Sequence, residues 1–381
     1  MHKKIGIIGG GQLGKMSILE GKKLGLSFVI LDPSSDCPAS TIVDEQIVDN
    51  YFNEEKIKEL ADKTDILTFE FEHINADYLM RLESMGYKIY PSPSTLKMVQ
   101  DKYQQKTFLN KHDIPTPRFM KVDSVKTITE AIKDFGLPLV LKSCTGGYDG
   151  KGNYLIRSHN EIELAYETLS KGSENLMVEE FVKFNMEISA LVARDINGKM
   201  EIYPLAENIH KDNILIRTIV PARINKEIEK KAKALALKTM EHLKGVGVFC
   251  IEMFVSNDGD VLINEIAPRT HNSGHYTIEA CRTSQFSQHL RAILELPLGS
   301  TELLKPAVMV NILGEEGFEG KTEVIGLEET LKIAECNVHI YGKKDTSGKR
   351  KMGHVTILEE NLDKALEISD MVLNTLKVIS S

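Results

Sequence analysis

Two glutamates near the middle of the chain have the spacing of a paired carboxylate site. Glu252 and Glu265 lie in apolar segments on either side of Asp258-Gly259, a dipeptide that favours a two-residue type I′ hairpin turn. That turn would place the two glutamates directly opposite each other, with Cβ atoms about 4.5–5.5 Å apart. Facing carboxylates repel unless a cation lies between them, and Mg²⁺ commonly takes one or two carboxylates together with substrate phosphates. We therefore predict a magnesium site, with a solvated sheet face as the alternative.

A dense polar run follows the second glutamate at once. Arg269, His271, Asn272 and His275 stand within eleven residues of Glu265. Such side chains beside a metal site are difficult to explain as part of an apolar core, whose polar groups need partners. We interpret the run as part of the same site, with a surface loop as the alternative.

A glycine-rich loop is the second feature that could carry chemistry. Four glycines lie in residues 146–152, between two predicted strands, and loop backbone N–H groups of this kind can enclose phosphates. It lacks the G-K-[ST] of a P-loop, and a strand rather than a helix follows. Lysines bracket the loop, and their charge suits phosphate oxygens. A long hairpin turn is the alternative to phosphate binding. The candidate residues are Lys142, Gly146, Gly147, Tyr148, Asp149, Gly150, Lys151 and Gly152.

Two further stretches give weaker signals. The segment Glu179, Glu180, Phe181, Val182 closes a predicted strand, where free backbone groups could contact an adenine edge while Glu187 holds ribose hydroxyls. An edge strand with solvated glutamates would look the same. Near residue 350 a basic turn could bind an anion or could be a solvated run of charge. Its members are Lys343, Lys344, Lys349, Arg350 and Lys351.

The N-terminal segment resembles a dinucleotide fingerprint. Residues 9–14, GGGQLG, follow a predicted strand and precede a predicted helix, and Asp32 ends the next strand. This pattern keeps a nicotinamide-dependent oxidoreductase as a hypothesis. The signal is weak alone, because any helix N-terminus with a glycine turn can hold a phosphate or a carboxylate.

The elements that must position these residues fall into three predicted domains. Strands alternate with helices over residues 3–95, which predicts a doubly wound parallel sheet. Proline-rich breakers near 90–102 and 114–117 mark boundaries. We predict an α/β domain at 1–95, an α+β domain at 96–300 with a lid at about 115–185, and a small mixed domain at 301–381.

Composition limits the possible functions. The 381 residues carry a formal net charge of −8, which argues against general affinity for nucleic acid or anionic membranes. The five cysteines are scattered without a CxxC pair, so neither a disulfide framework nor a zinc site is indicated. Residues 1–10 run into a strand without the apolar core of a signal peptide, and no apolar run approaches the ~20 residues of a membrane span. We expect a cytoplasmic protein.

Taken together, the motifs resemble the ATP-grasp superfamily over essentially the whole chain. They occur in the order GGGQLGKM, TFEFEHI, SCTGGYDGKG, VEEFV, NEIAPRTHNSGHYT and KRKMGH. Within the superfamily the chain is similar to the N5-carboxyaminoimidazole ribonucleotide synthetases. The resemblance implies an ATP-grasp fold with a pre-ATP-grasp domain, the cofactors ATP and Mg²⁺, and a homodimer. It also implies a reaction in which bicarbonate attacks the γ-phosphate of ATP and the resulting carboxyphosphate carboxylates 5-aminoimidazole ribonucleotide.

The resemblance also implies roles for individual residues. Those on the ATP side, besides the glycine loop, are Lys102, Lys142, Glu179, Glu180, Phe181, Val182, Glu187, His210, Asn264 and Glu265, and Glu252 and Glu265 would carry Mg²⁺. Catalytic roles are implied for Tyr148, Asp149, Lys151, Arg269, His271 and Asn272, and substrate contacts for Gln12, Glu72, Lys343, Arg350 and Lys351. The N-terminal glycines would then serve the acceptor substrate and bind no NAD.

Two positions depart from the family pattern. Lys102 stands where relatives often have arginine, which keeps the charge but loses any bidentate contact. Ala267 stands where the wider superfamily often has an asparagine metal ligand, so we assign no third protein ligand.

Three rival functions remain at this stage. A formate-dependent glycinamide ribonucleotide transformylase would share most of the site and differ around 269–276. An NAD-dependent dehydrogenase is supported only by residues 5–32 and leaves 140–276 unexplained. A non-catalytic nucleotide sensor would keep the ATP residues but would not need the polar run after Glu265.

Overall fold

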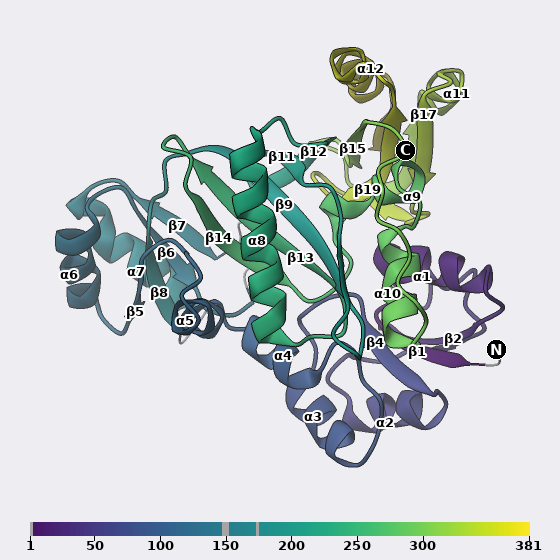
Figure 1. The fold of residues 1–381 in the computed structure, drawn as a ribbon, viewed down its shortest axis with the longest axis horizontal. Coiled ribbons are helices and arrows are strands. Elements are labelled where there is room, and N and C mark those ends of the chain that lie inside the picture. The colour runs from purple at the N-terminus through teal and green to yellow at the C-terminus, as the bar shows by residue number, and fades with distance from the viewer. Residues whose placement is uncertain (1–2, 147–151, 173–174) are drawn as a thin grey trace.

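The computed structural model describes residues 3–146, 152–172 and 175–381. Four sheets of four, nine, three and four strands organise these residues (Figure 1). The mixed parallel and antiparallel architecture confirms the predicted fold class. The domain boundaries at residues 95 and 300 stay predictions, because strands on both sides of residue 300 belong to one sheet.

The N-terminal sheet is parallel, as alternating strands and helices predicted. Its strands are β1 (Lys4–Ile8), β2 (Ser27–Leu31), β3 (Glu45–Ile47) and β4 (Ile66–Phe69), in the order β3-β2-β1-β4. Helices α1 (Gln12–Lys22), α2 (Glu54–Asp62) and α3 (Ala76–Ser84) accompany them. The third predicted strand is shorter than expected, because β4 ends at Phe69 and the chain turns at Glu70 toward the glycine loop. The sequence analysis did not anticipate β3.

The predicted lid contains a small antiparallel sheet with two helices. Helices α4 (Pro93–Val99) and α5 (Lys102–Lys111) lead into it. Strands β5 (Phe119–Val122), β8 (Leu176–Glu180), β6 (Leu139–Ser143) and β7 (Asn153–Ile156) pair in that order. Helices α6 (Val125–Phe135) and α7 (Ile162–Ser170), with the short helix η1 (His159–Glu161), complete this unit, and alternate strand positions bury its apolar core.

The nine-stranded sheet is the centre of the molecule; Glu265 lies on its edge strand β14 and Glu252 on the neighbouring strand β13. Its order is β14-β13-β9-β11-β12-β15-β19-β17, with β10 beside β9, and the long helix α8 (Lys226–Leu243) packs on the face of β14, β13 and β9 (Figure 1). The strands are β9 (Phe184–Arg194), β10 (Met200–Ile202), β11 (Ala206–Lys211), β12 (Ile214–Val220), β13 (Gly247–Ser256), β14 (Val261–Ala267), β15 (Ala307–Leu313), β17 (Cys336–Ile340) and β19 (Lys351–Leu358).

Short elements connect this sheet to the rest of the chain. They are η2 (Asn272–Gly274), α9 (Thr277–Ala280), α10 (Gln285–Ile293), α11 (Leu327–Leu331) and α12 (Leu362–Thr375), with a small sheet of β16 (Gly320–Ile325), β18 (Asp345–Thr346) and β20 (Lys377–Ser380). Within the described ranges, none of the helices combines the length and apolar character needed to cross a bilayer.

The turn of the β13–β14 hairpin differs from the two-residue type I′ turn that the sequence predicted. Ser256 N donates to Asp260 O at 2.9 Å, so the loop has three residues and ends with Gly259 at φ +81°. A three-residue loop with glycine in the left-handed region is the next most common hairpin geometry. The longer loop alone would move Glu252 away from Glu265. A bulge restores their pairing, because Met253 pairs with Ile263 and Asn264 is left as the extra residue.

Candidate active site

Glu252 and Glu265 pair directly across β13 and β14, and among the residues that the structure describes only Glu265 forms an ion pair with a lysine. Lys102 Nζ lies 2.9 Å from Glu265 Oε1. Burial opposes ionisation of Glu265, but the charge and hydrogen bond of Lys102 outweigh it and lower the pKa of Glu265. Burial, followed by the charge of Glu265, raises the pKa of Glu252 to about 7. The pair therefore has an excess of negative charge that a cation would relieve.

This pair fits Mg²⁺ chemically. Its oxygen atoms are hard ligands, and burial together with the charge of Glu265 disfavours ionisation of Glu252, which a bound cation would reverse. Among residues 3–146, 152–172 and 175–381, no group of three or more His, Cys, Asp or Glu side chains is arranged to hold a metal. The remaining ligands would then come from phosphates and water, which is usual for Mg²⁺.

Two lysines and a buried glutamate form the wall beside the carboxylate pair. Glu179 on β8 is only 2% exposed, and its Oε2 lies 3.2 Å from Lys106 Nζ and 3.1 Å from Lys142 Nζ. The alternative of a solvated edge strand is therefore wrong for Glu179, since β8 lies between β5 and β6. Burial opposes ionisation of Glu179, but the two lysine charges outweigh it and lower its pKa. Glu179 is therefore the internal counter-ion that holds the ammonium groups of Lys106 and Lys142 at the cavity.

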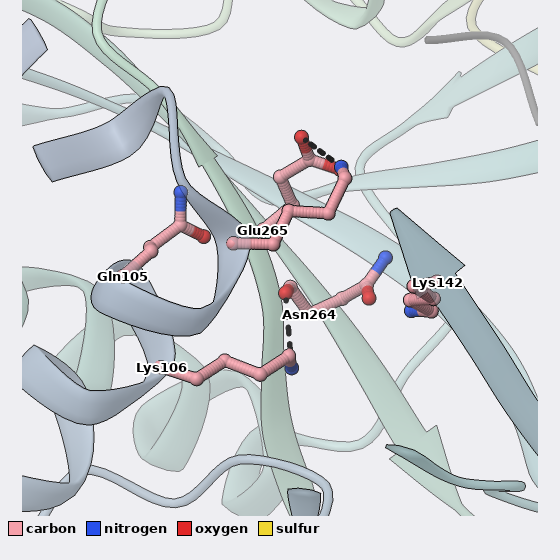
Figure 2. A pocket seen from close by; sticks show the side chains of 6 residues that line it. Gln105, Lys106, Lys142, Asn264 and Glu265 are labelled. Carbon is pink, nitrogen blue, oxygen red and sulfur yellow. Dashed lines mark hydrogen bonds and ion pairs between the residues drawn. The ribbon is translucent and has the colours of Figure 1, made fainter. Parts of the chain in front are cut away.

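Helix α5 carries Lys102 and Lys106, and the side chain of Gln105 anchors this helix to β14. Gln105 accepts from Ile266 N at 3.0 Å and donates to Ile266 O at 3.3 Å. Figure 2 shows Lys106 beneath Asn264, with Lys142 on the facing strand. The six side chains that line this cavity are Lys102, Gln105, Lys106, Lys142, Asn264 and Glu265. The sequence analysis missed Lys106, although it lies four residues after Lys102 and therefore on the same helix face.

The other residues predicted to contact adenine and ribose do not share the buried environment of Glu179. Glu180 points away from Glu179, and its Oε2 accepts from Arg118 Nε at 2.6 Å. Phe181 is exposed and follows β8. Glu187 on β9 forms an ion pair with His210 on β11. Burial opposes protonation of His210, but the hydrogen bond to Glu187 outweighs it and raises the pKa of His210.

The N-terminal glycine loop is closed by carboxylates of the chain itself. Glu70 accepts from the backbone N–H of Gly11 and from that of Gly14, the latter at 2.6 Å. Asp32 accepts from Gly10 N at 2.8 Å. The backbone amides that a dinucleotide pyrophosphate would use in the oxidoreductase hypothesis therefore already donate to carboxylates of the chain. Glu70 was not predicted, although TFEFEH contains it two residues before Glu72.

Arg269 connects the acceptor side to the carboxylate pair. Its Nε lies 2.8 Å from Glu72 Oε1, so β14 and the segment after β4 meet here. Gln100 holds the Glu72 backbone by donating to its carbonyl oxygen at 2.7 Å. His271 Nε2 lies 4.0 Å from Glu252 Oε1. Burial, followed by the charges of Arg269 and Lys351, lowers the pKa of His271 well below its ordinary value.

The predicted basic turn is not a single patch. Lys344 pairs with Asp36, Lys349 pairs with Asp212 and Glu316, and the exposed Arg350 donates to Asp345 O. Lys343 instead turns inward and donates to Lys351 O at 2.7 Å. Burial, with the charges of Arg350 and Lys351, lowers the pKa of Lys343 to about 8.

The structure thus brings part of the predicted residues to one region. The phosphate-side lysines, the carboxylate pair, and the polar run from Arg269 surround the end of β14, and Gln12 begins α1 beside the closed glycine loop. Gly146 and Gly152 have positive φ, as a glycine turn requires. Five predicted residues lie outside the described part of the chain: Gly147, Tyr148, Asp149, Gly150 and Lys151.

Lys142 lies on the small antiparallel sheet, Lys102 and Lys106 lie on helix α5, and the Glu252–Glu265 pair lies on the large sheet, an arrangement that resembles an ATP-grasp ligase. The chain matches the ATP-grasp domain over residues 107–286 and the ribonucleotide synthetase preATP-grasp domain over 1–100. Residues 307–368 match the phosphoribosylaminoimidazole carboxylase C-terminal domain.

Known proteins resemble the chain over nearly its full length. N5-carboxyaminoimidazole ribonucleotide synthase of Bacillus subtilis is 41% identical over 97% of this chain and 95% of that protein. The crystal structure of N5-carboxyaminoimidazole ribonucleotide synthetase from Thermotoga maritima is 47% identical and covers 100% of both chains with a TM-score of 0.91. An Aspergillus clavatus synthase solved with ADP and 5-aminoimidazole ribonucleotide is 32% identical, covers 97% of this chain and 99% of its own, and has a TM-score of 0.89. The chain therefore belongs to the N5-carboxyaminoimidazole ribonucleotide synthase family of ATP-grasp ligases.

Proposed function

We propose that this protein carboxylates the 5-amino group of 5-aminoimidazole ribonucleotide with bicarbonate and ATP, releasing ADP and phosphate. The observation that carries the proposal is the junction at β14. There the Glu252–Glu265 pair and its lysines, suited to phosphoryl transfer, adjoin Arg269 and His271, suited to an anionic acceptor. A dehydrogenase would leave this junction without a use, and a nucleotide sensor would not need its acceptor side.

On the nucleotide side, the lysines supply most of the charge. Lys142 and Lys106 share Glu179, and ATP phosphates would compete for the same ammonium groups. We assign adenine contact to the backbone of residues 179–182, ribose contact to Glu187, and loop closure to residues 146–152. A chain that neutralises phosphate charge and positions the reactants provides most of what phosphoryl transfer requires.

Glu252 and Glu265 would hold the Mg²⁺ that this superfamily uses with ATP. When bound, the ion neutralises charge on the phosphates. Lys102 keeps Glu265 ionised and orients it, while Asn264, the extra residue of the bulge, lines the same cavity.

On the acceptor side, the first step forms a bond between a bicarbonate oxygen and the γ-phosphorus as the bond to ADP breaks. In the second step the amino nitrogen attacks the carboxyl carbon, phosphate leaves and the nitrogen loses a proton. Arg269, held by Glu72, supplies positive charge for the bicarbonate-derived anion. We assign Gln12, Glu72, Lys343, Arg350 and Lys351 to the ribonucleotide, and Asn272, Tyr148, Asp149 and Lys151 to the reacting groups.

The proposal is tested by ADP release from ATP with Mg²⁺ and bicarbonate, with and without 5-aminoimidazole ribonucleotide. We expect the ribonucleotide to stimulate ADP release strongly and the stimulation to require bicarbonate. Formate with glycinamide ribonucleotide is the matched control for the rival transformylase. ATP hydrolysis that is indifferent to 5-aminoimidazole ribonucleotide would leave an ATP-grasp enzyme with another acceptor.

We further propose a cytoplasmic homodimer. The family resemblance supports both statements, and the scattered cysteines suit a reducing compartment. Sedimentation equilibrium of the full chain tests the assembly: a single species of twice the chain mass is expected, and a monomer at all concentrations would contradict it.

A further inference from the structure

A chain of buried hydrogen bonds crosses the large sheet and ends at His271. It runs through Thr218 on β12, Asn208 on β11 and Ser189 on β9, which are adjacent strands (Figure 1), and then through Ser273 in η2. Each of these four residues is 5% exposed or less. A polar chain in such a position is costly to bury unless all its members are paired, so its order of donors and acceptors is constrained.

Successive contacts in the chain are all within hydrogen-bond distance. Thr218 Oγ1 donates to Asn208 Oδ1 at 3.1 Å, and Asn208 Nδ2 donates to Ser189 Oγ at 2.9 Å. Ser189 Oγ then donates to Ser273 Oγ at 3.0 Å. The last contact joins Ser273 Oγ to His271 Nδ1 at 2.9 Å. Because Ser273 accepts from Ser189, its own hydroxyl proton is available for His271.

A backbone group fixes the direction at the end of the chain. Ser273 N lies 3.3 Å from His271 Nδ1, and an amide N–H can only donate. His271 Nδ1 is therefore an acceptor from both the amide and the hydroxyl of Ser273. A ring nitrogen that accepts a hydrogen bond carries no proton, so the ring proton of His271 resides on Nε2. That nitrogen is the one facing Glu252 and the candidate site.

A second buried side chain fixes the backbone of the same residue. Gln285, at the start of α10, accepts from His271 N at 2.8 Å and donates to His271 O at 2.7 Å. Gly274 permits this close approach, because a Cβ there would lie 2.5 Å from Gln285 Oε1. The main chain and the ring of His271 are thus held independently, which is the arrangement expected for a group whose orientation matters.

We propose that Ser273, Ser189 and Asn208 are positioning residues that hold His271 as its Nε2–H tautomer, so that His271 donates a hydrogen bond to the bicarbonate-derived anion and does not act as the base that deprotonates the amine. The inference rests on the proposed function for the identity of that anion. The tautomer itself is a property of the free protein. The amine proton must then leave through another group or through phosphate.

The direct test is the ¹⁵N spectrum of the histidine rings in the full-length protein at pH 8, with His271 assigned by the loss of its signals in His271→Gln. We expect an unprotonated, pyridine-type Nδ1 and a protonated, pyrrole-type Nε2. A protonated Nδ1 would overturn the proposal. Turnover with 5-aminoimidazole ribonucleotide is measured on the same sample, so a failed function and a failed tautomer assignment are separate results.

A set of variants tests whether the chain matters for the reaction. Ser189→Ala removes one neutral hydrogen bond, so we expect kcat to fall about 3- to 10-fold with the KM for ATP unchanged. Ser189→Thr keeps the hydroxyl and is expected to restore most of the rate. Ser369→Ala is the matched control, since Ser369 is equally buried and donates to Leu366 O at 2.7 Å, in α12.

Asn208→Asp reverses the order of the chain. An ionised carboxylate at this position cannot donate to Ser189, so Ser189 would turn its proton toward that carboxylate and the hydroxyl of Ser273 would follow. We expect a larger loss of kcat than in Ser189→Ala and a change in the ring ¹⁵N shifts of His271. If Ser189→Ala and Ser369→Ala have the same kcat and unaltered His271 shifts, the relay does not position His271. If Asn208→Asp does not fold, the comparison of Ser189→Ala with Ser189→Thr and the ¹⁵N spectrum of the wild-type protein still test the proposal.

Discussion

Glu252 and Glu265 occupy directly opposed positions on β13 and β14, yet the electrostatic surroundings of the two carboxylates differ. Lys102 lies beside Glu265, and the pKa of Glu265 is lowered. Burial and the charge of Glu265 raise the pKa of Glu252 to about 7. In the metal-free protein, one carboxylate is therefore ionised under all ordinary conditions and the other only at neutral pH and above. Several consequences of this asymmetry and of the surrounding contacts can be measured.

Glu252→Gln should stabilise the metal-free protein at alkaline pH. The pKa of Glu252 is about 7 in the folded protein, against an ordinary value of 4.5 that applies to the unfolded chain. Between these two pH values the folded state keeps a proton on Glu252 that the unfolded state has lost, so the free energy of unfolding falls as pH rises through this range. Glutamine removes that loss, which corresponds to about 1–3 kcal/mol at pH 8. The gain should shrink toward pH 5. Urea unfolding in EDTA at both pH values measures it, with the exposed Glu323→Gln as control.

Glu265→Gln should abolish Mg²⁺-dependent turnover without unfolding the protein. The amide cannot bind a hard cation as a carboxylate does, and it leaves Lys102 without its ion-pair partner. We expect a rate loss of at least ~100-fold that added Mg²⁺ does not restore, comparable to the loss of a main electrostatic group. Circular dichroism and thermal unfolding report the fold. Near-normal turnover would remove this glutamate from the metal site.

Lys102→Met should weaken Mg-ATP binding. Lys102 is the counter-charge of Glu265, and its loss would raise the pKa of that carboxylate and remove a cation from the phosphate cavity. We expect the KM for ATP to rise about 10-fold or more, as for loss of a charged hydrogen bond. Lys97→Met is the matched control, because Lys97 pairs with Asp77 on the exposed surface. Equal KM values for the two variants would contradict the role of Lys102.

Several features of this site follow from local sequence and several do not. The facing glutamates were correctly paired, although the predicted turn was one residue too short and the bulge at Asn264 compensated for it. The bulge breaks the alternation of β14, whose buried residues are Val261, Ile263 and Ile266, but a single break of this kind in the sequence does not reveal how the two strands pair. The fold class was predictable because each strand and helix carries its own pattern of burial.

Contacts between distant segments were the unpredictable part. The buried triad of Glu179 with Lys106 and Lys142 joins β8, α5 and β6, and isolated charges in a sequence read as solvent-exposed. Ser189 and Asn208 were overlooked for a similar reason, since small polar residues inside strands have no signal until their partners are known. The basic turn shows the converse: its charges are adjacent in the sequence, but Lys344 pairs with Asp36 and Lys349 with Asp212, in different parts of the fold.

Ribonucleotide binding should weaken as pH rises through about 8. Burial, with two neighbouring positive charges, lowers the pKa of Lys343 to about 8, so its ammonium is charged below that pH and neutral above it. If Lys343 contacts the anionic ribonucleotide, the KM for that substrate rises across this range while the KM for ATP stays constant. Lys343→Arg keeps its charge and should flatten the profile. An unchanged profile in that variant would place the titrating group elsewhere.

NADH should not bind, despite the glycine fingerprint. The Glu70 carboxylate accepts from the amides of Gly11 and Gly14, and Asp32 accepts from that of Gly10. A pyrophosphate would therefore have to displace one internal anion and approach another, which adds repulsion to the loss of hydrogen bonds. NADH fluorescence should show no saturation up to about 1 mM, a concentration at which a binding free energy near −4 kcal/mol would register. ADP, titrated in the same buffer with Mg²⁺, is the positive control. Saturation at micromolar NADH would mean that Glu70 leaves the loop, and the oxidoreductase hypothesis would have to be reopened.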